Sequence, residues 1–171
     1  MKNKTILIAS IILIGAFSRI IPHPPNFTAI GAISILGGLY FGKNYLAFLI
    51  PITAMLLSDF ILGYKMVISV YIAFLLIIPM GIKIKQNLSN SSVLKTSIYA
   101  SVLFFLITNF TSWLGNPFYP QHLSGLLMSY AAGIPFFLNT LLGNLFFCFS
   151  LFGLYEIISK KKFIYINSWK K

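Results

Sequence analysis

Long apolar runs alternate with short polar or proline-rich breaks along the whole chain, and this alternation defines the predicted elements. The runs do not alternate apolar and polar residues at every second position, as the strands of a membrane barrel would. Most of them approach the roughly 20 apolar residues that a helix needs to cross a bilayer. We therefore predict an all-α membrane protein with spans at about 5–21, 27–41, 45–62, 66–82, 93–114 and within 126–155.

The breaks between these runs have the composition of loops. The first is Pro22-His23-Pro24-Pro25-Asn26, which cannot be helical because prolines remove backbone donors and restrict the backbone. A polar segment follows at 83–92, and an uncharged loop with two prolines follows at 115–124. Gly133 and Pro135 favour a break that separates the beginning of the last run as an interfacial segment. The chain is thus expected to form one six-helix domain over 1–159, with a basic and aromatic interfacial tail at 160–171.

Composition supports this class and excludes others. Hydrophobic residues make up 58% of the 171 residues and charged residues only 9%, against roughly 25% charged in an average soluble domain. A soluble protein of this size has too few polar residues here to cover its surface. Aromatic residues reach 16%, which excludes a disordered chain.

The basic residues predict the orientation of the spans. The chain has 13 Lys and Arg against 2 Asp and Glu, and cytoplasmic loops of membrane proteins are rich in Lys and Arg. With six spans, one side holds eleven basic residues and the other holds only Arg19 and Lys65. Both termini are therefore expected in the cytoplasm, with the protein multi-pass in the cytoplasmic (inner) membrane, and the basic excess needs no nucleic-acid partner. The eleven are Lys2, Lys4, Lys43, Lys83, Lys85, Lys95, Lys160, Lys161, Lys162, Lys170 and Lys171.

A second interpretation of the first span stays open. Lys2 and Lys4, the apolar run Ile6–Gly15 and the small residues around Ser18 resemble a secretory signal with a cleavage site. Cleavage there would leave five spans and keep the C-terminus in the cytoplasm. Against it, the apolar run continues past Arg19 to Pro22.

Polar residues concentrate at the predicted outer ends of the spans. Polar groups inside a bilayer are costly, so their clustering at one depth predicts an outward-facing cavity that binds a polar or amphipathic small molecule. The expected binding residues are Arg19, His23, Asn26, Thr28, Asp59, Asn109, Trp113, His122, Tyr130 and Asn139.

Structural roles compete with binding at several of these positions. Arg19 and Asp59 could form a buried charge pair that only joins two helices, or Arg19 could extend to the interface. Trp113 and Tyr130 could be ordinary interfacial aromatics. Asn139, near the middle of the membrane, could hydrogen-bond a neighbouring helix instead of lining a cavity.

Catalysis, metals and cofactors have little support in the sequence. No pair of carboxylates and no Ser, His and Asp series is apparent, so we expect no enzyme and no cofactor. His23, His122 and Asp59 could meet as metal ligands, but none of them has the spacing of ligands on a helix, and no metal is predicted. The one cysteine, Cys148, excludes an internal disulfide.

Several blocks of the chain resemble a family of small bacterial integral membrane proteins of unknown function. The most specific is the His-Pro-Pro-Asn-Phe-Thr block at 23–28, within Arg19–Ala32. Asn144, after Gly143, and Leu138 stand where this family usually has an acidic and a basic residue, which weakens charge-dependent roles there. The other matching blocks are Gly37-Gly38, Met55–Gly63, Thr108-Asn109, Tyr119-Pro120 and Ile134–Gly143.

That family is in turn similar to the substrate-binding (S) subunits of energy-coupling-factor (ECF) vitamin transporters. The resemblance implies six helices, both termini inside, uptake of a vitamin-like molecule from the outer side, and a partner membrane coupling subunit with ATPases. The first span lacks the small-residue motif that such subunits use to dock the coupling protein: Ile11, Gly15 and Arg19 do not supply it. The alternative function is a membrane scaffold or assembly protein whose outer polar cluster is structural.

Overall fold

The computed structural model describes the backbone of residues 2–159, and within that range the chain is all-helical. The predicted tail at 160–171 lies outside the described residues. One 3₁₀ turn, Lys85–Asn87, follows the fourth helix. The α-helices are α1 (Lys2–Ile20), α2 (Ile30–Phe41), α3 (Leu46–Leu62), α4 (Ile68–Ile84), α5 (Asn90–Trp113) and α6 (Leu123–Ser159).

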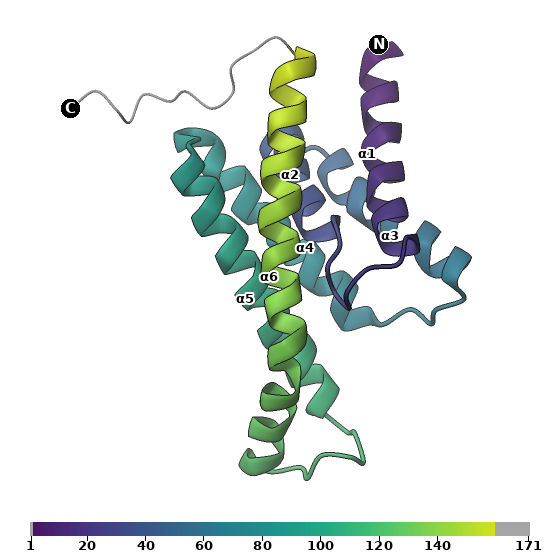
Figure 1. Ribbon diagram of the computed structural model, residues 1–171, viewed down its shortest axis with the longest axis vertical. Coiled ribbons are helices and arrows are strands. Elements are labelled where there is room, and N and C mark those ends of the chain that lie inside the picture. The colour runs from purple at the N-terminus through teal and green to yellow at the C-terminus, as the bar shows by residue number, and fades with distance from the viewer. Residues whose placement is uncertain (1, 160–171) are drawn as a thin grey trace, which may run out of the picture.

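The helices form one bundle from which a long hairpin projects (Figure 1). The beginning of α1 and the end of α6 lie at the same end of the bundle, at the top of the view. Helices α5 and α6 run side by side and continue well beyond the loops that follow α1 and α3. The loop between α5 and α6 therefore lies farther from the beginning of α1 and the end of α6 than the loops that follow α1 and α3.

Helix α2 is the core of the bundle. It is apolar all round, and its residues from Ile30 to Leu39 are all buried. It contacts α3, α4 and α6, and most closely α4. At the crossing with α4, a Cβ added to Gly38 would meet the carbonyl oxygen of Ile78, and one added to Gly81 would meet that of Ile35. Two glycines facing each other thus allow the two backbones to touch.

Helix α6 corrects one prediction. No break occurs at Gly133 or Pro135, and α6 is continuous over 37 residues, about 55 Å at the usual rise of an α-helix. A proline removes a single backbone donor, and helices in apolar surroundings tolerate this. Gly133 serves a different purpose, because a Cβ there would meet the side-chain oxygen of Asn109 on α5. It is a site of close helix packing.

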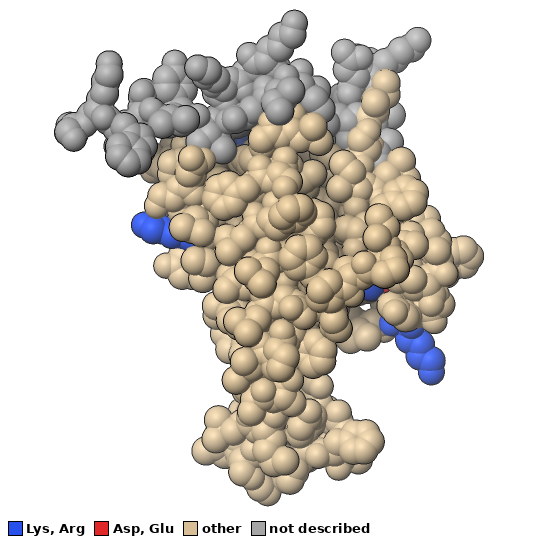
Figure 2. Space-filling view, viewed as in Figure 1, with Lys and Arg blue, Asp and Glu red and all other residues tan. Residues whose placement is uncertain are grey.

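The helix lengths and the surface indicate a membrane protein. Three helical segments, Ile68–Asn87, Asn90–Trp113 and Leu123–Leu154, are long and apolar enough to cross a bilayer. The shorter apolar helices are Ser10–Ile20, Ile30–Phe41 and Leu46–Leu62. Figure 2 shows a face that is mostly uncharged, with basic side chains in a few places only. Many large apolar side chains of the described residues are exposed, and Phe60 is 86% exposed.

The glycine crossing yields a stability prediction. Gly38→Ala and Gly81→Ala should each destabilise the protein by about 3 kcal/mol, because the new methyl group meets backbone atoms that cannot move aside. The measurement is thermal unfolding in a mild detergent. Gly153→Ala is the matched control: a Cβ there meets nothing within 4 Å, so it should be neutral or stabilise α6 by up to about 1 kcal/mol. Equal melting temperatures for all three variants would contradict the close crossing.

Candidate functional site

An ion pair joins the end of α1 to the end of α3. Nη1 of Arg19 lies 2.6 Å from Oδ1 of Asp59, and it also donates to the Ser58 hydroxyl at 2.6 Å. The second carboxylate oxygen of Asp59 accepts a hydrogen bond from the Tyr71 hydroxyl of α4 at 2.6 Å. The side chains of Arg19 and Asp59 are only 16% and 9% exposed. Three helices therefore meet at one buried, charge-paired point.

Small residues allow α1 to approach closely enough for this pair to form. One turn before Arg19, a Cβ on Gly15 would lie 2.7 Å from the Ile33 side chain and 3.0 Å from the Cβ of Ala54. A larger side chain at position 15 would push α1 away from α2 and α3. Because Arg19 follows Gly15 by four residues, it lies on the same face of the helix and reaches α3.

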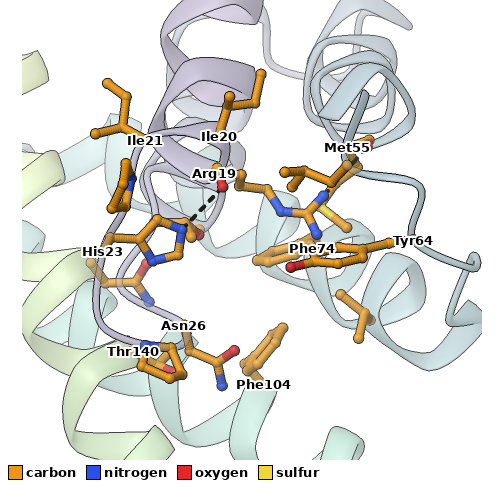
Figure 3. A pocket seen from close by; sticks show the side chains of 17 residues that line it. Arg19, Ile20, Ile21, His23, Asn26, Met55, Tyr64, Phe74, Phe104 and Thr140 are labelled. Atoms are coloured by element: carbon orange, nitrogen blue, oxygen red, sulfur yellow. Dashed lines mark hydrogen bonds between the residues drawn. The ribbon is translucent and has the colours of Figure 1, made fainter. Parts of the chain in front are cut away.

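A cavity of about 510 Å³ lies beside the ion pair, within the range of small-molecule sites. Figure 3 shows its setting: Arg19 reaches from the end of α1 toward Met55, while His23, Phe74 and Tyr64 surround the space next to it. Every helix contributes to the wall. The lining residues are Arg19, Ile20, Ile21, Pro22, His23, Pro25, Asn26, Thr28, Gly31, Met55, Leu62, Tyr64, Val70, Phe74, Phe104, Thr140 and Asn144.

The loop between α1 and α2 is shaped to line this cavity. The amide of Phe27 donates to the carbonyl of Pro24, and Asn26 adopts a left-handed backbone conformation with φ of 67°. Asparagine tolerates this conformation better than most residues. The loop is held to α1 at its far end, because the amide of Ala29 donates to the hydroxyl of Ser18.

His23 is held by backbone carbonyl oxygens of the same loop. Its Nδ1 lies 2.7 Å from the carbonyl oxygen of Pro24, and its Nε2 lies 3.2 Å from that of Arg19. Neutral imidazole carries one N–H, so it can donate to only one of the two. The ring borders the cavity, yet both of its nitrogens already face protein acceptors.

Helix α6 closes the opposite wall with polar groups. Asn144 is 3% exposed and donates from Nδ2 to the Ser101 hydroxyl of α5 at 2.8 Å. Its Oδ1 lies against Gly31, where a Cβ would collide with it. Thr140, one turn earlier on the same face, donates to the carbonyl of Phe136. At Gly143 a Cβ would lie 3.2 Å from the backbone of Phe27, so α6 also packs against the loop.

A smaller cavity of about 350 Å³ also borders the ion pair and shares Met55, Tyr64 and Val70 with the larger one. Arg19 borders both cavities, whereas Asp59 borders only the smaller one. Lys65 also lines this smaller space and is absent from the wall of the larger one. Arg19 therefore borders one space whose described lining has no carboxylate and one space that Asp59 also borders.

The structure brings together half of the predicted binding residues. Arg19, His23, Asn26 and Thr28 line the larger cavity, and Asp59 lies next to it through its pair with Arg19. The hypothesis that Arg19 and Asp59 pair is confirmed by their contact, and in the same contact Arg19 reaches α3 instead of extending to the surface.

The other five predicted residues lie on the α5–α6 hairpin or on α6, away from this wall. Asn109 donates to the carbonyl of Phe105, and the Tyr130 hydroxyl donates to that of Leu106. Trp113 donates to the carbonyl of Pro120, and His122 contacts Ser124. Asn139 is half-buried but does not line the cavity. None of these five residues lines the larger cavity, so the predicted binding residues do not all meet in it.

Sequence reasoning missed several residues of the site. On α6 it selected Asn139, whereas Thr140 and Asn144 line the cavity. Their four-residue spacing places both on one helix face, and this was the available signal. Tyr71, the partner of Asp59, and the apolar walls Phe74 and Phe104 carry no sequence pattern that distinguishes them from other membrane residues.

Metal binding gains no support from the geometry. Among the described residues, no group of three or more His, Cys, Asp or Glu side chains is placed to hold a metal ion. His23 lies in the α1–α2 loop and His122 in the α5–α6 loop.

The fold and the site together describe a helical membrane protein with a cavity beside a buried ion pair. The chain matches the model of a family of unknown function, DUF6580, over residues 1–167, and it belongs to this family. Neither the curated proteins nor the solved structures contain a match to it.

Removal of one charge should destabilise the protein more than removal of both. Asp59→Leu leaves Arg19 buried without its counter-charge, which should cost about 3 kcal/mol in thermal unfolding. The double variant Arg19→Met/Asp59→Leu should recover most of this loss. Tyr71→Phe keeps the pair and removes one bond to the carboxylate, so it should cost about 2 kcal/mol. Additive losses in the double variant would show that the two charges do not interact.

Proposed function

We propose that this protein is a membrane-embedded binding subunit that takes up a vitamin-like small molecule from the outer side. The observation that carries the proposal is the cavity of about 510 Å³ bordered by the buried Arg19–Asp59 pair. Its wall combines apolar side chains with a few polar ones, as in most small-molecule sites. Binding, not catalysis, is the proposed role, and the S subunits of ECF transporters are the model. A coupling subunit with ATPases is the partner that this model implies.

The proposal includes six membrane crossings with both termini in the cytoplasm. The basic residues support it, as does the position of the beginning of α1 and the end of α6 at one end of the bundle (Figure 1). The short α2 does not contradict six crossings. Its 12 residues reach only about 18 Å, but it is surrounded by protein and needs no contact with lipid across the full bilayer.

Single-cysteine labelling tests this topology. In a Cys148→Ala background, a cysteine at Lys65 or Asn116 should react in intact cells with a thiol reagent that cannot cross the membrane. A cysteine at Lys43 or Lys85 should react only after the cells are opened. Because Cys148 is the only native cysteine, its replacement leaves no other thiol in the protein to react. Labelling of Lys43 and Lys65 positions from the same side would contradict the six-span arrangement.

Ligand stabilisation tests the binding function. The purified protein should copurify with a small molecule, or its melting temperature should rise with at least one compound of a broad vitamin panel. Thr140→Val and Asn144→Leu change the cavity wall without touching the ion pair, and they should remove that rise. Thr111→Val is the control, since it removes a comparable hydroxyl on an exposed face of α5 outside the wall. A protein that neither copurifies with a small molecule nor is stabilised by any compound would contradict a binding role.

The alternative is a membrane scaffold, and the α5–α6 hairpin is the feature that favours it. Its polar side chains bond within the hairpin: Ser129 and Tyr130 of α6 donate to backbone carbonyls of α5. Such bonds hold helices together and need no ligand. A scaffold predicts that cavity substitutions lower stability equally with and without added compounds.

A further inference from the structure

The guanidinium of Arg19 is only partly used by the protein. All its contacts are made by Nη1, which reaches Asp59, the Ser58 hydroxyl and the carbonyl of Met55. Within the part of the chain that the structure describes, Nε and Nη2 donate to no protein acceptor. These two nitrogens form the edge of the guanidinium that binds a carboxylate or phosphate with two parallel hydrogen bonds.

Asp59 does not bind this edge, and each of its two carboxylate oxygens has another partner. One receives Nη1 of Arg19 and the other receives the hydroxyl of Tyr71. The ion pair is therefore monodentate, because only Nη1 of the guanidinium contacts the carboxylate. It holds the guanidinium in place and leaves two donors directed elsewhere.

The larger cavity is the space that suits an anion. No Asp or Glu among the described residues lines it, whereas the smaller cavity is bordered by Asp59. The ring nitrogens of His23 already face backbone carbonyls. Arg19 is therefore the cationic side chain in this wall, and its Nε and Nη2 donors can bind an anion.

The rest of the wall adds neutral polar groups and an apolar surface. The side chains of Asn26 and Thr28 make no hydrogen bond to any described residue, although both border the cavity. Beyond them lie Phe74 and Phe104, whose ring centroids are 5.0 Å apart. Figure 3 shows Asn26 beside Phe104 and Thr140, across the cavity from Arg19.

From this arrangement we infer that the larger cavity recognises an organic acid, with its carboxylate on Nε and Nη2 of Arg19 and its apolar body against Phe74 and Phe104. Asn26 and Thr28 bond to polar groups on the body of the acid. This inference rests on the proposed binding function and names the chemical class of its ligand.

The test compares acids with their uncharged counterparts. The purified protein is titrated with octanoate, 4-phenylbutanoate and indole-3-butanoate, and with the primary amide of each, while thermal unfolding and heat of binding are measured. At least one acid should bind about tenfold more tightly than its amide, because a charge-assisted pair is lost in the amide.

Variants then locate the contact. Arg19→Lys keeps a positive charge beside Asp59 but removes the two-donor edge, so it should weaken acid binding about tenfold or more. Lys65→Gln removes a positive charge that borders only the smaller cavity, and it should leave acid binding unchanged. Asn26→Gly should weaken binding of indole-3-butanoate, whose ring N–H is a polar group on the body of the acid, and should leave binding of octanoate unchanged. Glycine adopts the φ of 67° at this position freely, so the backbone of the loop can be kept.

The outcomes separate the inference from the proposed function. Equal binding of acids and amides overturns recognition of an acid but leaves a binding role intact. Loss of acid binding in Lys65→Gln together with unchanged binding in Arg19→Lys places the anion in the smaller cavity and also overturns the inference. If no acid and no amide binds, recognition of apolar acids is overturned, and the vitamin panel decides the binding role by itself.

Discussion

A buried positive charge constrains this protein more than any other single feature. Arg19 is 16% exposed, in a bundle whose surroundings offer few polar groups, so it needs a counter-charge within reach. Asp59 supplies that charge and is held by Tyr71 from a third helix. The end of α1, the end of α3 and the beginning of α4 must therefore keep their relative positions. The loop that follows Arg19 turns beside this junction and lines the cavity.

Close helix packing holds the helices in the relative positions that let Arg19 and Asp59 meet. Gly38 and Gly81 let α2 and α4 touch through their backbones, and Gly15 lets α1 lie against α2 and α3. With α2 buried on all sides, the outer helices are arranged around it. The site is thus a result of packing by small residues, and its polar groups are placed by helices that approach unusually closely.

The α5–α6 hairpin has a different role from the rest of the bundle. Its upper part contributes Phe104, Thr140 and Asn144 to the cavity, whereas its projecting part bonds mainly to itself. Some polar residues of the hairpin thus line the cavity, whereas others bond to backbone carbonyls of α5. This division explains why a cluster that looks uniform along the sequence separates into two groups in space.

The sequence by itself determined the class of protein and the approximate helices, because long apolar runs and proline breaks act locally on the backbone. It also singled out Arg19 and Asp59, since charges are rare in such a chain. Only the tertiary structure decided which polar residues share a cavity. Thr140, not Asn139, faces it, and the difference is one residue of helix rotation, about 100° in a helix of 3.6 residues per turn. The continuity of α6 through Pro135 was likewise visible only in the tertiary structure, where α6 packs closely against Asn109 of α5 at Gly133, two residues before the proline.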